Sequence, residues 1–287
     1  MIPKTIIAAA CLALGAGGAA AFEARLVKAS EATFQRPHDL TLTSDGLYLL
    51  VADVGNHVVK VLVPGTLETI GVIGEGELSS PHDVDIDARG RVLIADSGND
   101  RTVLYSFDGV GHGGAIAERL AVWDRDQGSP EGVAAGTGGR VYVTNASLNT
   151  VIQLNDGAVT ATMETSVSGP LDRPHDIEAD HLGRVFAADP GNNRILVLDQ
   201  SLGFVSSLEG PPFDFNEPKY LAVDEKGWLF VADEMNNLIK VFDDAYRPVG
   251  TVGLGDGLNQ PEGVAVAGRY IWVSDTYNNR ILLYRRE

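Results

Sequence analysis

Two short motifs recur in step six times along the chain, and this repetition constrains the fold more than any other feature. In the first motif, a proline is followed by two variable residues and an aliphatic residue. The second motif, Asp-x-x-Asn, follows about 15 residues later in five units, and Asn145-Ala-Ser takes its place in the third. Two motifs that keep step predict a repeat architecture. The prolines lie 44, 49, 44, 44 and 43 residues apart, at Pro37, Pro81, Pro130, Pro174, Pro218 and Pro261.

Each unit has the pattern of four short β-strands. In the second unit, apolar Val84 and Ile86 alternate with aspartates, turn residues follow at 87–90, and a second apolar run covers 92–95. A third apolar run and a more variable fourth one complete the unit, and no segment shows a helical period. Four strands in about 44 residues predict an all-β fold, namely a six-bladed β-propeller of four-stranded blades.

The sixth unit predicts how the ring closes. Residues 261–287 hold only three strands, whereas residues 22–36 precede the first proline and hold one strand. An open ring would expose sheet edges. We therefore predict that residues 24–33 supply the outer strand of blade six. The predicted propeller covers residues 22–287, with its closing strand in 22–36 and blades that begin near residues 37, 81, 130, 174, 218 and 261.

Residues 1–21 have the pattern of a signal peptide. Lys4 supplies a positive charge, an apolar stretch follows, and Ala19-Ala20-Ala21 fits a cleavage site near Ala21. We expect a periplasmic or secreted protein. The only cysteine, Cys11, lies in this leader, so the mature chain forms no disulfide.

The charge of the chain narrows its partners. A net charge of −17 disfavours binding to nucleic acid, which requires a basic face. No apolar run outside the leader is long enough for a membrane span. We expect a monomer that binds a protein, a peptide or a small molecule at the top face of the propeller.

The residue after each proline forms one column around the ring. Three of the six histidines of the chain fall in this column. Since the inner strand of each blade lines the channel, the column is expected at the channel mouth. Its members are His38, His82, Glu131, His175, Lys219 and Glu262.

Imidazoles that converge from several blades would suit a divalent metal. Zinc in open sites takes three nitrogen or oxygen ligands and a water. We therefore consider His38, His82 and His175 as ligands of Zn²⁺ or another divalent metal, with Glu131 and Glu262 as possible further ligands. The aspartates that follow the histidines could orient the rings. In the alternative interpretation, histidine serves local hydrogen bonds and the rings never meet.

The repeat resembles the NHL-repeat family of six-bladed β-propellers over residues 22–287. The resemblance is carried by the proline motif, by the period, and by the Asp-x-x-Asn-Asn-Arg loops at 189–194 and 275–280. It implies the fold. It does not imply one function, because propellers serve as enzymes, binding proteins and scaffolds.

Part of the chain also resembles the peptidyl-α-hydroxyglycine α-amidating lyases. These propellers hold zinc through three histidines that each follow a proline. The resemblance implies His38, His82 and His175 as ligands, Asp176 as a functional aspartate and Tyr277 as a catalytic tyrosine. However, the histidines here lie on blades one, two and four instead of alternate blades, and no arginine follows the loop aspartates.

Two main functions therefore remain open, beside a purely structural propeller whose rim recruits partners. The first is an exported propeller that binds a ligand or partner at the channel mouth, with or without a metal. The second is a metal-dependent lyase or hydrolase at the same place. Its candidate catalytic residues are Asp176, Lys219, Tyr220 and Tyr277.

Overall fold

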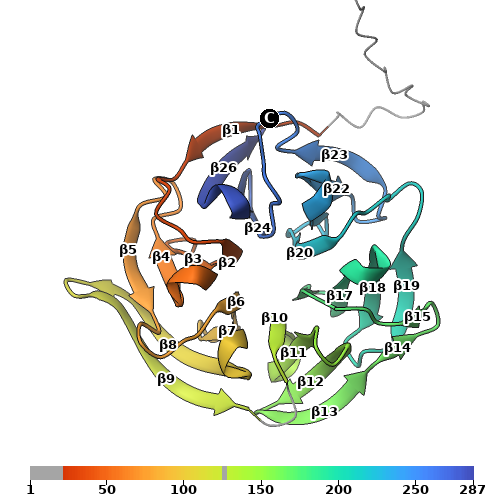
Figure 1. Cartoon of the computed structure of the whole chain (residues 1–287), viewed down its shortest axis with the longest axis horizontal. Helices are drawn as coiled ribbons and strands as arrows, with labels where there is room; N and C mark the ends of the chain where they lie inside the picture. Colours follow the sequence, from red (N-terminus) through yellow and green to blue (C-terminus); the bar gives the residue numbers. More distant parts are fainter. Residues whose placement is uncertain (1–21, 125–127) are drawn as a thin grey trace, which may run out of the picture.

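Six four-stranded antiparallel sheets surround a central channel in the computed structural model (Figure 1). The structure describes residues 22–124 and 128–287. The predicted six-bladed propeller is thus confirmed. The predicted signal peptide lies outside the described residues. No helix in the described part of the chain is long and apolar enough to cross a bilayer.

The strands of each blade follow one another from the channel to the rim, except in blade six. The innermost strands are β2 (Pro37–Leu42), β6 (Pro81–Ile86), β10 (Pro130–Ala135), β16 (Ile177–Ala179), β20 (Pro218–Val223) and β24 (Val264–Ala267). The second strands are β3 (Leu49–Asp53), β7 (Val92–Asp96), β11 (Arg140–Asn145), β17 (Arg184–Asp189), β21 (Leu229–Asp233) and β25 (Tyr270–Asp275).

The outer half of each blade is built in the same way. The third strands are β4 (Val58–Leu62), β8 (Arg101–Gly111), β12 (Thr150–Asn155), β18 (Arg194–Asp199), β22 (Leu238–Phe242) and β26 (Arg280–Arg286). The outermost strands are β5 (Thr69–Ile73), β9 (Gly114–Trp123), β13 (Ala158–Met163), β19 (Phe204–Leu208), β23 (Pro248–Val252) and β1 (Ala24–Ala29). Two short strands, β14 (Thr165–Ser166) and β15 (Gly169–Pro170), form a separate hairpin.

The N-terminal strand closes the ring, as predicted. β1 pairs antiparallel with β26, so that Ala24 lies opposite Arg286 and Ala29 opposite Leu282. Blade six therefore has the order β1-β26-β25-β24 and joins the two ends of the described chain in one sheet.

The hydrophobic core is divided among the blade interfaces. Six buried clusters are present in the described residues, one between each pair of neighbouring blades. Between blades five and six, for example, Val241 packs in the same cluster as Val273 and Leu282, all fully buried. Each sheet thus buries both faces against its neighbours, which explains the apolar second and third strands.

The aspartate of the second motif accepts several hydrogen bonds at the top of each of the five blades that contain it. Asp189 accepts hydrogen bonds from the amide of Asp172 at 2.8 Å and from the side chain of Asn192 at 2.9 Å. Arg194 Nε also donates to it at 2.7 Å. The bonded amide lies two residues before the proline of the same unit. The spacing between the two motifs is therefore constrained in each of these units. The same amide bond recurs at Asp53, Asp96, Asp233 and Asp275.

Short 3-10 helices follow the second strands and link neighbouring blades. The residue after each of the five helices that follow a second strand has a left-handed backbone, which suits asparagine. The Asn193 side-chain oxygen accepts the amide of Glu217 in the next blade at 2.8 Å. Equivalent backbone amides are accepted by the side chains of His57, Asn149, Asn237 and Asn279. The helices are η1 (Val54–Asn56), η2 (Ser97–Asn99), η4 (Pro190–Asn192), η5 (Glu234–Asn236) and η6 (Thr276–Asn278), whereas η3 (Thr137–Gly139) lies between β10 and β11.

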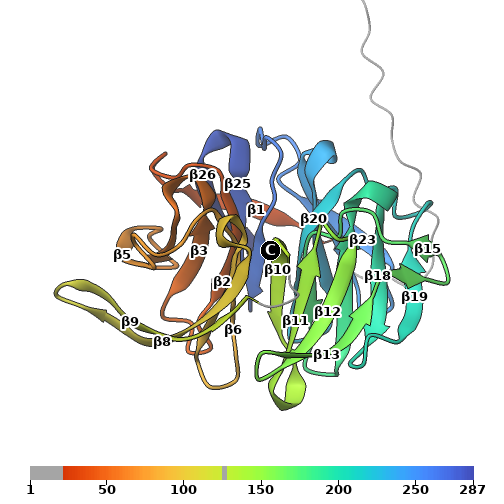
Figure 2. The ribbon, with the colours of Figure 1, turned by 60° about the horizontal axis from the view of Figure 1, so that its bottom comes forward.

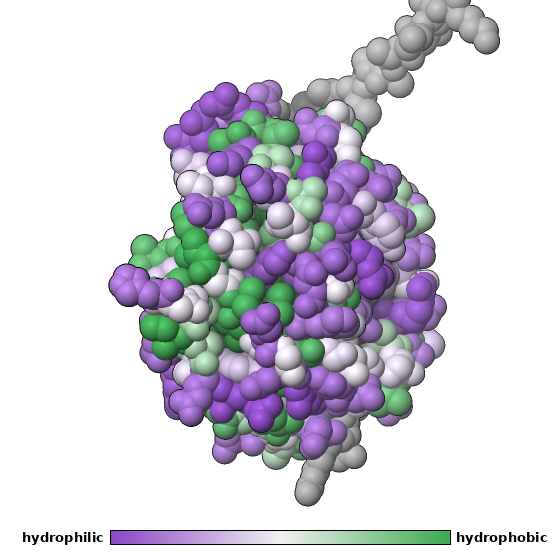
Figure 3. Space-filling model, turned by 60° about the vertical axis from the view of Figure 1, so that its left-hand side comes forward, coloured by the Kyte–Doolittle hydropathy of each residue, from purple (hydrophilic) through white to green (hydrophobic). Residues whose placement is uncertain are grey.

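A long hairpin explains the wider second repeat. β8 and β9 extend beyond blade two and lie against blade one, where Phe107 packs edge-on against Tyr48 (Figures 1 and 2). The other face of β9 leaves Ile116 and Leu120 half exposed. Apolar groups are interspersed with polar ones on this side of the molecule (Figure 3). Residues 109–114 form the tip of this hairpin.

Candidate functional site

The three histidines of the predicted column lie together at the mouth of the channel. The ring centres of His38 and His82 are 4.6 Å apart, and that of His175 is 6.4 Å from each. The blades that carry them are not alternate ones. They meet because residues one step after the proline all face the axis of the ring.

Two glutamates of the same column lie beside these rings. Glu131 contacts Nδ1 of His82, and its Oε2 is 3.8 Å from Nε2 of His175. Glu262 Oε2 is 3.4 Å from Nδ1 of His38. Each Pro-Glu-Gly blade thus precedes a Pro-His-Asp blade. We call His38, His82, Glu131, His175, Lys219 and Glu262 the mouth cluster.

Glycine in the two Pro-Glu-Gly blades allows this close approach. A Cβ atom on Gly132 would lie 2.7 Å from the carbonyl oxygen of His175, and one on Gly263 would lie 2.3 Å from that of His38. Both contacts are with backbone, which cannot turn aside as a flexible side chain can. The glycines therefore set the positions of the neighbouring histidines.

Burial keeps two of the imidazoles neutral. It lowers the pKa of His38 and of His175 well below the usual value, and neighbouring positive groups, among them Lys219, lower both further. Burial also raises the pKa of Glu262 to about 8, so this carboxyl is protonated at neutral pH. Nδ1 of His38 and Nδ1 of His175 are buried and have no hydrogen-bond partner among the described residues.

Tyr220 crosses the channel next to the rings. Its hydroxyl donates to the carbonyl oxygen of His82 on the opposite blade at 3.0 Å, and its ring packs edge-on against His175 at 4.9 Å. Burial raises the pKa of Tyr220 well above the usual value, so it remains a hydrogen-bond donor. Lys219 contacts η5 of its own blade, with Nζ 3.6 Å from Oε2 of Glu234.

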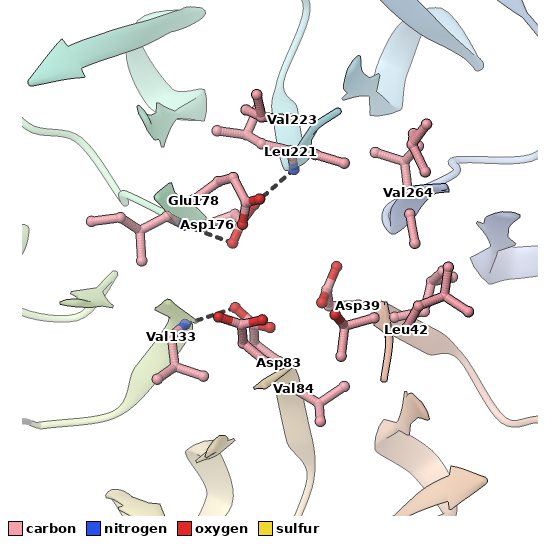
Figure 4. Close-up of a pocket in the computed structure, with 17 residues that line it drawn as sticks. Asp39, Leu42, Asp83, Val84, Val133, Asp176, Glu178, Leu221, Val223 and Val264 are labelled. Carbon is pink, nitrogen blue, oxygen red and sulfur yellow. Dashed lines mark hydrogen bonds between the residues drawn. The ribbon is translucent and has the colours of Figure 1, made fainter. Parts of the chain in front are cut away.

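The aspartates that follow the histidines line a cavity of about 200 Å³ in the channel. Asp83 accepts the amide of Val133, and Asp176 accepts that of Leu221, each at 2.7 Å (Figure 4). In both cases the donor is the inner strand of the next blade. Inner-strand amides that face the channel need such partners. Asp83 and Asp176 therefore join neighbouring blades, and no hydrogen bond among the described residues links either of them to an imidazole.

These carboxyls are crowded and buried, which favours their neutral forms. Burial raises the pKa of Asp176 to about 7 and that of Asp85 to about 6. Burial and the charge of neighbouring carboxylates hold the pKa of Asp39 and of Asp83 well above the usual value, and the two share a hydrogen bond. Burial and neighbouring carboxylates also hold the pKa of Glu178 well above its usual value.

Tyr277 lies apart from this arrangement. It belongs to η6 on the top face and is 49% exposed. Its amide donates to the carbonyl oxygen of Asn259, and none of its contacts among the described residues reaches the histidines. Tyr220, which crosses the channel, is the better placed of the two tyrosines.

The mouth cluster has the donors of a zinc site but not its finished geometry. Three imidazoles on one tetrahedral zinc place their ring centres about 5 Å apart, given bonds of about 2.0 Å. The observed spacings lie on both sides of that value. No group of three or more histidine, cysteine, aspartate or glutamate side chains in the described residues is arranged to hold a metal as it stands. The donor chemistry fits, and the rings would have to move for all three to reach one ion.

Comparisons with known proteins agree with the fold. The NHL repeat family model matches residues 258–283, within blade six. No curated protein matches the chain.

Several solved structures are similar over most of the chain. An inactive histidine-to-alanine variant of virginiamycin B lyase from Staphylococcus aureus, with quinupristin, is 14% identical, with a TM-score of 0.60, covering 88% of this chain and 81% of that one. A streptogramin B lyase is 14% identical, with a TM-score of 0.62 and coverages of 92% and 87%. A Bacteroides thetaiotaomicron protein of unknown function is 15% identical, with a TM-score of 0.70 and coverages of 90% and 71%. At these identities the likeness shows a common β-propeller fold, here with an NHL repeat in its last blade.

Proposed function

We propose that the channel mouth binds a small ligand or a peptide, and that it does so through a divalent transition metal such as zinc. His38, His82 and His175 would hold the metal, with Glu131 as a further ligand. The observation that supports this most directly is a pair of buried Nδ1 atoms, on His38 and His175, that form no hydrogen bond with the described residues and lie beside a third imidazole. The Glu262 carboxyl approaches Nδ1 of His38 to 3.4 Å without completing such a bond. Buried polar atoms without partners are costly, so a ligand that satisfies them is strongly favoured.

The remaining residues of the mouth would shape how a ligand is held. With the three histidines as ligands, a bound metal would keep its fourth position for Glu131 or for a ligand oxygen or nitrogen that displaces it. Lys219 offers a positive charge at the rim of the mouth, and protonated Glu262 offers a hydrogen-bond donor close to His38. Tyr220 crosses the channel beside the rings, so we expect a ligand to reach them from the top face.

We further propose that the protein acts in the periplasm or outside the cell. This rests on the charged, apolar and small-residue pattern of residues 1–21. An exported binding protein without disulfides is compatible with the six buried clusters that hold the blades together.

The test is elemental analysis of protein purified without a histidine tag. We expect about one equivalent of a divalent transition metal, lost in His175→Ala and in His38→Ala. The matched control is His181→Ala, because His181 is an exposed histidine outside the cluster. Absence of metal from the purified protein, together with an unchanged melting temperature on addition of zinc, would rule out the metal site.

A metal-dependent lyase is the second candidate, and Glu262 favours it. A general acid works best when its pKa lies near the working pH, and burial places that of Glu262 at about 8. The similar structures named as lyases suggest quinupristin as one substrate to try, and the partial resemblance to amidating lyases suggests a peptidyl-α-hydroxyglycine. Loss of either compound with zinc-loaded protein, abolished in Glu262→Gln while zinc is retained, would support this candidate. Stability of both compounds would favour the binding function.

A further inference from the structure

A second recess lies between blades two and three, beside the turns that follow their inner strands. It has a volume of about 600 Å³, within the usual range for small-molecule sites. Leu93, Leu104 and Val141 form its buried apolar floor. We call it the arginine groove because Arg89, Arg91 and Arg140 line it, together with Trp123 and the glycine-rich turn at 136–139.

Two of the three arginines of this groove differ from most others in the protein. Of the fifteen arginines in the described residues, eleven have a carboxylate within 4.0 Å. Arg89 and Arg140 are two of the four that do not. In a chain of net charge −17, two uncompensated guanidinium groups in one recess are unusual.

The two arginines without a carboxylate partner come from opposite sides of the groove. Arg89 belongs to the turn between β6 and β7 in blade two, whereas Arg140 begins β11 in blade three. Arg140 Nη1 donates to the carbonyl oxygen of Thr137 at 2.9 Å, which fixes the guanidinium and leaves other N–H groups available. Arg91 is neutralised by Asp87 through contacts of 2.6 and 2.7 Å. Asp156 is the remaining carboxylate in the lining, and it is exposed.

An aromatic side chain completes the recess. Trp123 is partly buried and packs on the β12–β13 turn, where a Cβ on Gly157 would lie 2.4 Å from the indole ring. Glycine at this turn therefore makes room for the ring. The indole offers an apolar face next to the cationic groups.

We propose that the arginine groove binds an organic anion, with a phosphate or carboxylate group held by Arg89 and Arg140 and an apolar or aromatic body against Trp123. Guanidinium groups suit such anions because their N–H donors match the oxygen spacing of carboxylate and phosphate. The buried leucines below provide apolar contact for the body of the ligand. This site is independent of the channel mouth and of any metal there.

The test uses calorimetric titration of the full-length mature protein with phenyl phosphate, benzoate, inorganic phosphate and phenol. We expect saturable binding of phenyl phosphate or benzoate, weaker binding of inorganic phosphate, and none of phenol. Arg89→Gln and Arg140→Gln should each weaken binding about tenfold or more, as expected for loss of a charge-assisted hydrogen bond. Trp123→Leu should remove the advantage of phenyl phosphate over inorganic phosphate.

The matched control is Arg269→Gln, since Arg269 is exposed, lies outside the groove and also lacks a carboxylate partner. Its affinity should equal that of the unmodified protein. The proposal is overturned if neither phenyl phosphate nor benzoate binds saturably, or if Arg269→Gln weakens binding as much as the groove variants do. Circular dichroism of each variant separates loss of binding from loss of fold.

Discussion

Glycine at the inner strand of blade three has a role that a sequence motif does not reveal. Gly132 donates its amide to Thr144 Oγ1 at 2.8 Å, and that hydroxyl contacts the carbonyl oxygen of His175 in the next blade. The small residue thus allows two inner strands to approach and fixes His175 through its backbone. Glycine here reflects a close approach of two chains, since its backbone needs no left-handed angle.

Gly132→Ala should therefore destabilise the propeller by about 1–3 kcal/mol, as overpacking of a well-filled site does. The new Cβ would lie 2.7 Å from the His175 carbonyl oxygen and 2.8 Å from Cα of Asp176, so the backbone must shift. Urea unfolding measures the effect. The control is Gly65→Ala, where nothing lies within 4 Å of the added atom. Equal stability of the two variants would contradict this account of the inner strands.

At the scale of elements, five of the six blades have an ion pair to a buried aspartate at their top. Asp189 is fully buried and Arg194 is 2% exposed. Arg194 also donates to the carbonyl oxygens of Ser168 and Pro170, which anchors the hairpin before blade four. Blades two and six use arginine in the same way, while blades one and five use lysine.

Asp189→Ala should cost about 3–5 kcal/mol, because the charge of Arg194 would stay buried without its partner. Removal of both charges in Asp189→Ala/Arg194→Met should recover part of that loss. Thermal or urea unfolding measures both variants, with exposed Asp244→Ala as the control. A single variant as stable as the control would show that the pair is not needed for the loop.

These elements also show what could be predicted from the sequence. The strands, the blade number and the closing strand could be predicted because the pattern is local and is repeated six times. The aspartate loops could be interpreted as structural for the same reason. The convergence of the column could be expected, because residues at equivalent positions in a ring must face the same axis.

Other features depend on contacts between blades and left little trace in one unit. Asp83 and Asp176 bond to the next blade, and Tyr220 reaches the blade opposite. In each of these three hydrogen bonds, the two partners lie far apart in the sequence. The sequence holds one signal for the asparagines that link blades. The loops that end at Asn193 and Asn279 each contain a second asparagine, and its side chain accepts the amide of the residue directly before the proline of the next blade.

For the whole molecule, the channel is the place where polar groups from three blades share one buried space, next to the mouth cluster to which all six blades contribute. Asp39, Asp83, Asp176 and Glu178 converge there from blades one, two and four (Figure 4). Burial raises the pKa of Asp176 to about 7 and that of Glu262 at the mouth to about 8. These groups are neutral in the folded protein at a pH where the unfolded chain has lost its protons.

The folded protein should therefore become less stable as the pH rises from 6.5 to 8.5. A carboxyl whose pKa is raised on folding contributes its full stability below its unfolded pKa of about 4, and this contribution is lost as the pH rises through the folded value. The lowered pKa of His38 and of His175 acts in the opposite direction and, because unfolded histidine has a pKa of about 6.5, offsets part of the loss up to about pH 7.5. Above that pH, the carboxyls determine the slope.

The loss between pH 6.5 and 8.5 should be on the order of 2 kcal/mol, from the linkage of proton binding to folding. Urea unfolding of protein freed of metal by EDTA measures it. Glu262→Gln should flatten the slope, because the amide does not titrate, whereas Glu75→Gln, an exposed glutamate away from the channel, should leave it unchanged. Stability that stays constant or rises over this range would mean that the channel carboxyls are ionised in the fold, and that a bound cation or water neutralises the repulsion between them.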